Sequence, residues 1–90
     1  MTSTQMSKDG ASLSGAKNGD AVRIRKMQGG QQFLSRLASL GFTPGAHLKV
    51  IQNYGSGPII VRVRDTRVAL GRGEASKILV EEDSEDDDGL

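Results

Sequence analysis

Cysteine is missing from this chain of 90 residues. Without cysteine the protein can form neither a disulfide framework nor a thiolate metal site, and a reducing cytoplasm is the expected compartment. Long apolar runs are missing too, since no stretch approaches the ~18 residues that a membrane span needs. The opening residues, MTSTQMSKDGASLSG, also lack the apolar core of a signal peptide. We therefore expect neither secretion nor membrane insertion.

Side chains that perform chemistry are scarce. His47 is the single histidine, and it would need two or three further ligands to hold a metal ion. No carboxylate lies near it in the sequence, and strand parity places it beside Lys49 on a solvated face. We therefore expect no metal site, no catalytic residue and no cofactor, and we expect that the protein is not an enzyme.

The net charge of +1 hides a division along the chain. The last ten residues, EEDSEDDDGL, hold seven of the eleven acids, whereas the preceding eighty carry twelve Lys and Arg against four acids, a net charge of +8. Composition predicts a disordered polar N-terminus at 1–17, one barrel domain at 18–82 and a disordered acidic tail at 83–90. The tail could be a solubilising run, a weak binder of hard cations, or an internal competitor that covers the basic body.

Hydrophobic periodicity predicts a mainly β fold. Alternating apolar residues indicate strands in five segments, DAVRIRKM (20–27), AHLKVIQNY (46–54), IIVRVR (59–64), RVAL (67–70) and ILV (78–80). Asp65-Thr66 is the predicted hairpin tip between the third and fourth segments. In QQFLSRLASL (31–40), apolar residues at helical spacing indicate one short helix. Five short strands, one helix and tight turns predict a small closed or nearly closed barrel, because closure hides strand edges.

The segment LASLGFTPGAHLKV (37–50) predicts a helix end fixed to the start of a strand. Gly41 stands where a helix favours a left-handed residue, and Phe42 follows it in position to pack back on Leu37, as in a Schellman motif. Pro44-Gly45 fits the centre of a type II turn, in which glycine supplies the positive φ. We name this arrangement, residues 41–46, the helix–strand clip.

Arginines dominate the polar positions of the predicted sheet. The expected outward basic set is Arg23, Arg25, Arg62, Arg64, Arg67 and Arg72. This set could be a solvated face, a surface for an acidic protein partner, or a surface for nucleic acid. Single-strand nucleic acid readers use aromatic stacking platforms, and two of the three aromatic residues here, Phe33 and Phe42, belong to the helix and its cap. RNA or another polyanion is therefore the alternative ligand.

Three segments resemble the FeoA family, small cytoplasmic proteins of bacterial ferrous iron uptake. They are FLSRLASLGFTPGAHLKV, GPIIVRVRDTRVAL and EASKILVE, in that order and at natural spacing across roughly residues 20–82. The resemblance implies an SH3-like barrel with a helix laid on it. It also implies a role with FeoB, a membrane permease whose cytoplasmic portion carries a GTPase domain. A related barrel forms the C-terminal domain of iron-dependent repressors, but no helix-turn-helix precedes it here, which disfavours that function.

The sequence thus predicts a non-enzymatic accessory protein that binds the cytoplasmic GTPase-bearing region of a ferrous iron permease. The residues expected at the partner contact surround the helix–strand clip, with two arginines for charge. They are Gly41, Thr43, Pro44, Gly45, Tyr54, Arg62 and Arg64. For Gly41, Pro44 and Gly45 a structural role is the alternative.

Overall fold

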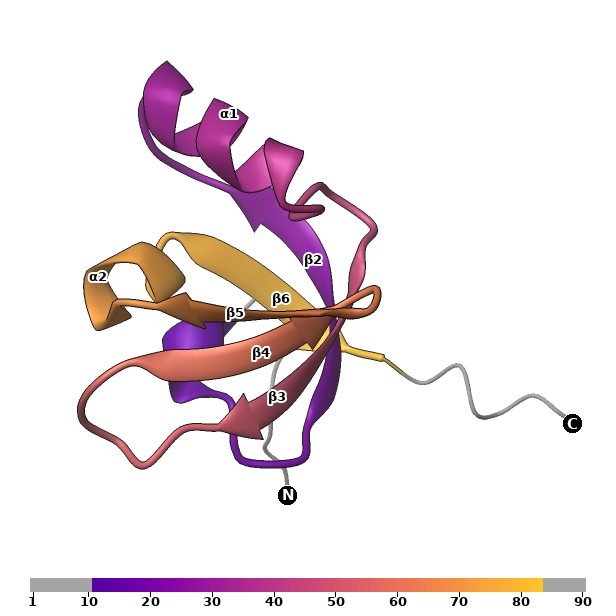
Figure 1. The fold of residues 1–90 in the computed structure, drawn as a ribbon, viewed down its shortest axis with the longest axis vertical. Coiled ribbons are helices and arrows are strands. Elements are labelled where there is room, and N and C mark those ends of the chain that lie inside the picture. The colour runs from indigo at the N-terminus through magenta and orange to yellow at the C-terminus, as the bar shows by residue number, and fades with distance from the viewer. Residues whose placement is uncertain (1–10, 84–90) are drawn as a thin grey trace, which may run out of the picture.

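Six antiparallel strands curl into a small barrel in the computed structural model, which describes residues 11–83 (Figure 1). Their order in the sheet is β1-β6-β2-β3-β4-β5. The strands are β1 (Ala11–Ser12), β2 (Ala21–Met27), β3 (His47–Gln52), β4 (Ile59–Val63), β5 (Thr66–Leu70) and β6 (Ile78–Glu82). The helices are the 3-10 turn η1 (Leu13–Gly15), α1 (Gln31–Ser39) and α2 (Arg72–Ala75). None of the helices within residues 11–83 is long and apolar enough to cross a membrane.

The alternation read from the sequence places one face of each strand in the core. The buried set from β2 to β6 is Val22, Ile24, Leu48, Val50, Ile59, Val61, Val63, Leu70, Ile78 and Val80. Register shifts at Ile24/Lys26 and Val50/Gln52 mark irregularities of the bulge type, which bend a sheet and increase its twist. The mainly β prediction is confirmed, and the five expected strands are joined by the very short β1.

The N-terminal boundary predicted at residue 18 is wrong for residues 11–17. Strand β1 pairs with β6, and the Leu13 side chain behind it is fully buried in the core cluster. Ala16 is also buried, at 4% exposure. The average hydrophobicity of this segment is low, because Leu13 stands alone in a polar stretch. The average therefore gave no sign that its side chain packs in the core of the barrel. The disorder expected for residues 1–10 and for the tail from 84 onward lies outside the described residues.

Helix α1 projects from the barrel (Figure 1), and a hydrogen-bonded cap closes its C-terminal end. The Gly41 N–H donates to the Ala38 carbonyl at 3.0 Å and the Phe42 N–H to the Leu37 carbonyl at 2.9 Å, which is the predicted Schellman motif. Gly41 has φ of 102° and Phe42 is buried. Of the predicted apolar stripe only Leu37 is buried, while Leu40 is 38% exposed. Phe33, near the start of the helix, is partly buried against the core, so the helix is attached by its cap and by limited packing.

The β4–β5 hairpin turns one residue earlier than predicted. Val63 and Thr66 are Cα partners, so the two-residue loop between them is Arg64-Asp65 rather than Asp65-Thr66. Arg64 takes φ of 59°, a left-handed value that is uncommon for a residue other than glycine. The prediction placed Asp65 first in the turn because Asp favours turns. The pairing of β4 with β5 instead places Arg64 first.

A candidate protein-docking surface

A groove lies where the helix–strand clip meets the β4–β5 hairpin. Its volume is about 470 Å³, and its lining is Thr43, Pro44, Gly45, Ala46, His47, Val63 and Arg64. The clip is a built turn: the Ala46 N–H donates to the Thr43 carbonyl at 2.9 Å, and Gly45 has φ of 91°. The Gly45 N–H also donates to the Ile24 carbonyl at 2.7 Å, which fastens the turn to β2. Pro44 is thus held exposed at the rim of the groove.

The groove contains four of the seven residues predicted at the partner contact. Thr43, Pro44, Gly45 and Arg64 line it. Gly41 is buried beneath it, where an added Cβ would lie 3.2 Å from Val63 Cγ2, so the structural role applies to this glycine.

The other two predicted contact residues lie outside the groove. Arg62 is exposed on the outward face of β4. Tyr54 is 72% exposed but follows the far end of β3, whereas the groove lies at the start of that strand. A partner that contacts all of the exposed predicted residues would therefore extend along β3 and β4.

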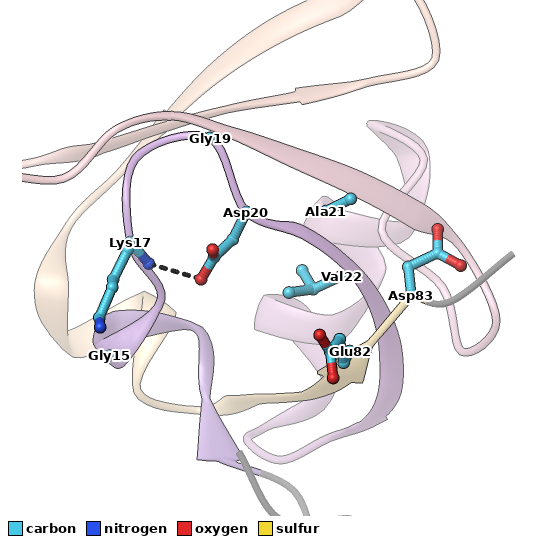
Figure 2. A pocket seen from close by; sticks show the side chains of 8 residues that line it. All are labelled: Gly15, Lys17, Gly19, Asp20, Ala21, Val22, Glu82 and Asp83. Atoms are coloured by element: carbon cyan, nitrogen blue, oxygen red, sulfur yellow. Dashed lines mark hydrogen bonds between the residues drawn. The ribbon is translucent and has the colours of Figure 1, made fainter. Parts of the chain in front are cut away.

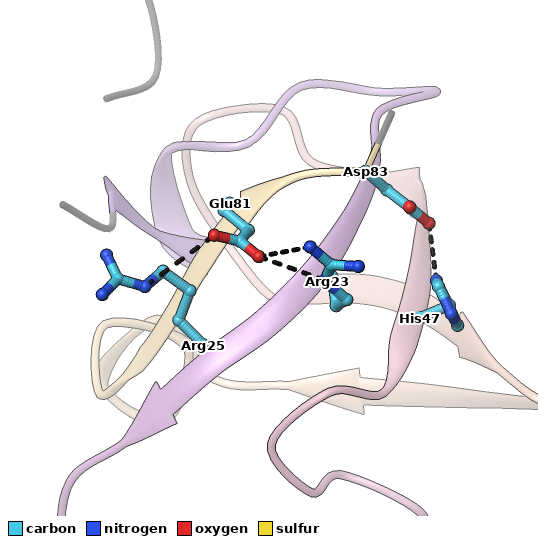
Figure 3. Close-up of polar contacts among 5 residues, drawn as sticks. All are labelled: Arg23, Arg25, His47, Glu81 and Asp83. Carbon is cyan, nitrogen blue, oxygen red and sulfur yellow. Dashed lines mark hydrogen bonds and ion pairs between the residues drawn. The ribbon is translucent and has the colours of Figure 1, made fainter. Parts of the chain in front are cut away.

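Two of the predicted outward arginines share one carboxylate of β6, that of Glu81 (Figure 3). Arg23 donates to Glu81 Oε2 from Nε at 3.1 Å and from Nη2 at 2.6 Å. This hydrogen bonding with Glu81 raises the pKa of Arg23. Arg25 Nε lies 3.9 Å from Glu81 Oε1. These two cations therefore belong to a local ion-pair cluster and contribute less to an open basic face.

His47 is paired with an acid that is remote in sequence. Its Nδ1 lies 2.7 Å from Asp83 Oδ2, and the two side chains are 62% and 5% exposed (Figure 3). Sequence distance concealed this contact, because β6 brings Asp83 beside β2 and the Asp83 N–H donates to the Ala21 carbonyl. The other Asp83 oxygen, Oδ1, is buried without a hydrogen-bond partner among the described residues. Nowhere in residues 11–83 do three His, Asp or Glu side chains gather as a metal site would need.

Arg72 was wrongly expected in the outward basic set. It stands at the start of α2 and is half-buried. Its guanidinium donates to the Ser14 carbonyl at 2.8 Å, and to Asn53 Oδ1 and the Gly57 carbonyl at 3.1 Å each. Arg72 therefore fastens η1 and the β3–β4 loop to α2. The exposed cations that remain near the groove are Lys49, Arg62, Arg64 and Arg67. The predicted basic set omitted Lys49, although the alternation of β3 already placed it on the outward face.

A second hollow, of about 590 Å³, lies between the η1–β2 loop and the end of β6 (Figure 2). Its lining is Gly15, Lys17, Gly19, Asp20, Ala21, Val22, Glu82 and Asp83. Asp20 Oδ2 accepts a hydrogen bond from the Lys17 backbone N–H at 2.8 Å, and Asp83 turns its carboxylate to His47. Because the lining mixes both charge signs, and because the Asp20 and Asp83 carboxylates have internal partners, this hollow is a weaker candidate than the groove.

Comparison with known proteins places this architecture in a family. Residues 11–82 match the sequence model of the FeoA domain. The chain belongs to the FeoA family. The match begins at residue 11, which agrees with the burial of Leu13 and not with a domain that starts at residue 18.

Individual relatives agree with the family assignment. Fe(2+) transport protein A of Methanocaldococcus jannaschii is 41% identical over 70 residues, which are 78% of this chain and 84% of that protein. The crystal structure of an iron uptake regulatory protein, FeoA, has a TM-score of 0.76 at 35% identity, covering 80% of this chain and 96% of that one.

A FeoA relative also identifies the type of barrel. Stenotrophomonas maltophilia FeoA, solved in complex with zinc and described as a prokaryotic SH3 domain protein, has a TM-score of 0.71 at 26% identity. The alignment covers 79% of this chain and 89% of that one. The expected SH3-like barrel is thereby confirmed, and the family connects the chain with iron transport.

Proposed function

We propose that this protein is a non-enzymatic accessory protein of ferrous iron uptake that binds and regulates a FeoB-type permease from the cytoplasmic side. Membership of the FeoA family supports the connection with iron transport. The observation that carries the contact itself is the groove at the helix–strand clip, whose rim residues Thr43 and Pro44 are exposed on a rigid turn. A docking site on a turn fixed by backbone hydrogen bonds needs little ordering when the partner arrives.

A pull-down with purified components tests this function. The intact protein is immobilised, and either the cytoplasmic GTPase-bearing region of a FeoB-type permease or RNA is passed over it near physiological salt. We expect the permease region to be retained and RNA to be released, because counterion-driven binding weakens steeply with salt whereas apolar burial is not screened.

Two substitutions locate the contact. Thr43→Arg fills the groove without adding negative charge, and Tyr54→Ala removes the exposed aromatic ring. We expect each to weaken the permease interaction by at least about fivefold without unfolding the barrel, the size typical of an interface residue that matters. Gln32→Arg, on the exposed surface of α1, adds the same charge away from the groove and serves as the control.

Retention of RNA with sequence preference, together with loss of the permease region, would show that the protein is an RNA-binding barrel instead. Equal effects of Thr43→Arg and Gln32→Arg would show that the groove is not the contact.

A further inference from the structure

Three cations stand in one row across the outer face of the sheet. In the strand register Lys49 of β3 is the partner of Arg62 of β4, and Arg62 is the partner of Arg67 of β5. All three are exposed, and their neighbours Leu48, Val61 and Val63 are buried, so the three side chains share the outward face. Like charges directly opposite one another destabilise a sheet. The row is therefore a feature that the fold tolerates and does not require.

No acid within residues 11–83 neutralises this row. The ion pairs of the described residues join Arg23 and Arg25 to Glu81, Arg36 to Glu74, and His47 to Asp83. Lys49, Arg62 and Arg67 take part in none of them. Their charge remains available to an anion from outside the described part of the chain.

An apolar ledge runs beside the basic row. The next pair on the outward face of β4 and β5 is Ile60 with Ala69, of which Ile60 is half-buried and Ala69 exposed. A surface that sets cations beside aliphatic groups suits a protein partner with acidic and apolar side chains together. A nucleic acid would leave the ledge uncovered, and no aromatic side chain belongs to this row for a base to stack on.

The spacing of the row favours a helix. Directly opposite residues of neighbouring strands have Cβ atoms about 4.5–5.5 Å apart. Residues on one side of an extended peptide repeat at about 6.6–6.8 Å, twice the rise per residue of a strand. The Cβ atoms of residues three or four apart on a helix are about 5–6 Å apart, which matches the row more closely.

We propose that Lys49, Arg62 and Arg67 form the docking surface for an acidic helix of a partner protein, whose carboxylates recur once per turn and whose axis crosses the strands. This inference rests on the proposed function, to which it adds the chemistry of the partner's contact surface. The row lies beside the groove, since His47 and Arg64 of the groove lining belong to β3 and to the hairpin that ends β4. One partner can therefore contact both.

Model peptides test the helix without the permease. Three alanine-based peptides carry three Glu each: one helix with the Glu on one face a turn apart, one helix with them spread around the axis, and one proline-containing chain with them at every second residue. Fluorescence anisotropy against the intact protein at low salt measures affinity. We expect the first peptide to bind at least about threefold more tightly than either other, because only it can face all three cations together.

Variants that remove one positive charge distinguish binding at the row from attraction of the acidic peptide to the protein's overall positive charge. Arg62→Gln, at the centre of the row, should weaken the first peptide by about three- to fivefold, the upper range for an exposed ion pair. Lys26→Gln removes one exposed charge from β2 and should change affinity by less than about twofold, because it lies outside the row.

Each contrary outcome has a definite meaning. Equal affinity for the three peptides, or equal effects of the two variants, would overturn the proposal in favour of net charge alone. Binding of an RNA oligonucleotide in preference to the acidic helix near physiological salt would overturn it in favour of nucleic acid. If the peptides fail while the permease region is retained, only this inference falls; if the aligned helix binds while the permease region does not, the proposed function falls.

Discussion

Glu74 is one side chain on which two helices depend. Its Oε1 accepts a hydrogen bond from the Gly71 N–H at 3.1 Å, which satisfies the start of α2, and its Oε2 accepts one from the Arg36 guanidinium of α1. The Gly71 hydrogen bond, followed by the Arg36 contact, holds the pKa of Glu74 below its ordinary value of 4.5. The charged form of this residue thus fastens the projecting helix to the barrel.

The lowered pKa of Glu74 predicts a pH dependence of stability. A carboxylate with a lowered folded-state pKa contributes stability above pH 4.5 and loses it as the pH falls through the folded value. Urea midpoints measured from pH 6 down to pH 3 should therefore decline less steeply for Glu74→Gln than for the natural chain. Glu82→Gln, an exposed acid at the end of β6, serves as the control. Identical slopes for Glu74→Gln and the natural chain would contradict the role assigned to this residue.

At the scale of elements, helix α1 and the 3-10 turn η1 are joined to the barrel by different kinds of contact. Helix α1 is joined to the barrel by its Schellman cap, by Arg36–Glu74, and by Lys77, whose Nζ lies 5.2 Å from the centre of the Phe33 ring. By contrast, η1 is joined by burial: Leu13 is in the core, and Ser14 accepts hydrogen bonds from Arg72 and Asn53. The short N-terminal element is thus the more firmly integrated of the two.

Two leucine substitutions compare these elements. Leu13→Ala should lower the free energy of unfolding by about 2–5 kcal/mol, since it empties a fully buried site. Leu40→Ala, at the end of α1 where the side chain is 38% exposed, should cost well under half as much. Chemical denaturation of both variants measures the difference. Nearly equal losses of unfolding free energy would mean that Leu13 of η1 contributes no more to the core than Leu40 at the end of α1.

At the scale of the whole molecule, the charged side chains of residues 11–83 lie mostly at the surface, and the exception is Asp83, whose side chain is 5% exposed beside His47. The buried residues of the described core are hydrophobic, and the Arg23–Glu81 and Arg36–Glu74 ion pairs lie at the surface. His47 and Asp83 supply two of the ligands that a metal would need, at the point where β6 ends.

This distribution predicts weak iron binding by the barrel. In anaerobic calorimetry, the chain shortened to residues 1–83 should show no ferrous iron binding tighter than roughly micromolar, because two ligands without a third leave the ion largely hydrated. His47→Ala should leave the titration unchanged. A stoichiometric tight site that His47→Ala abolishes would show that the His47–Asp83 pair nucleates a metal site.

The sequence by itself determined the mainly β fold, the inward face of each strand and the helix–strand clip. These features are local: alternation assigns Val22, Leu48 and Val61 to the core, and the Gly41 and Gly45 positions require a positive φ that glycine supplies without strain. Thr43, Pro44 and Gly45 are consecutive, so the sequence placed them together in the clip, but the groove that they line comes from the structure.

Only the tertiary structure decided which charges remain open. Glu81 neutralises Arg23 across 58 positions of sequence, and Asp83 reaches His47 across 36. Arg72 turned out to be a half-buried fastener, and Lys49 joined Arg62 and Arg67 only through strand register. Such contacts depend on which strands become neighbours, a choice made by burial of the whole core, and hydrophobic periodicity within one strand carries no information about it.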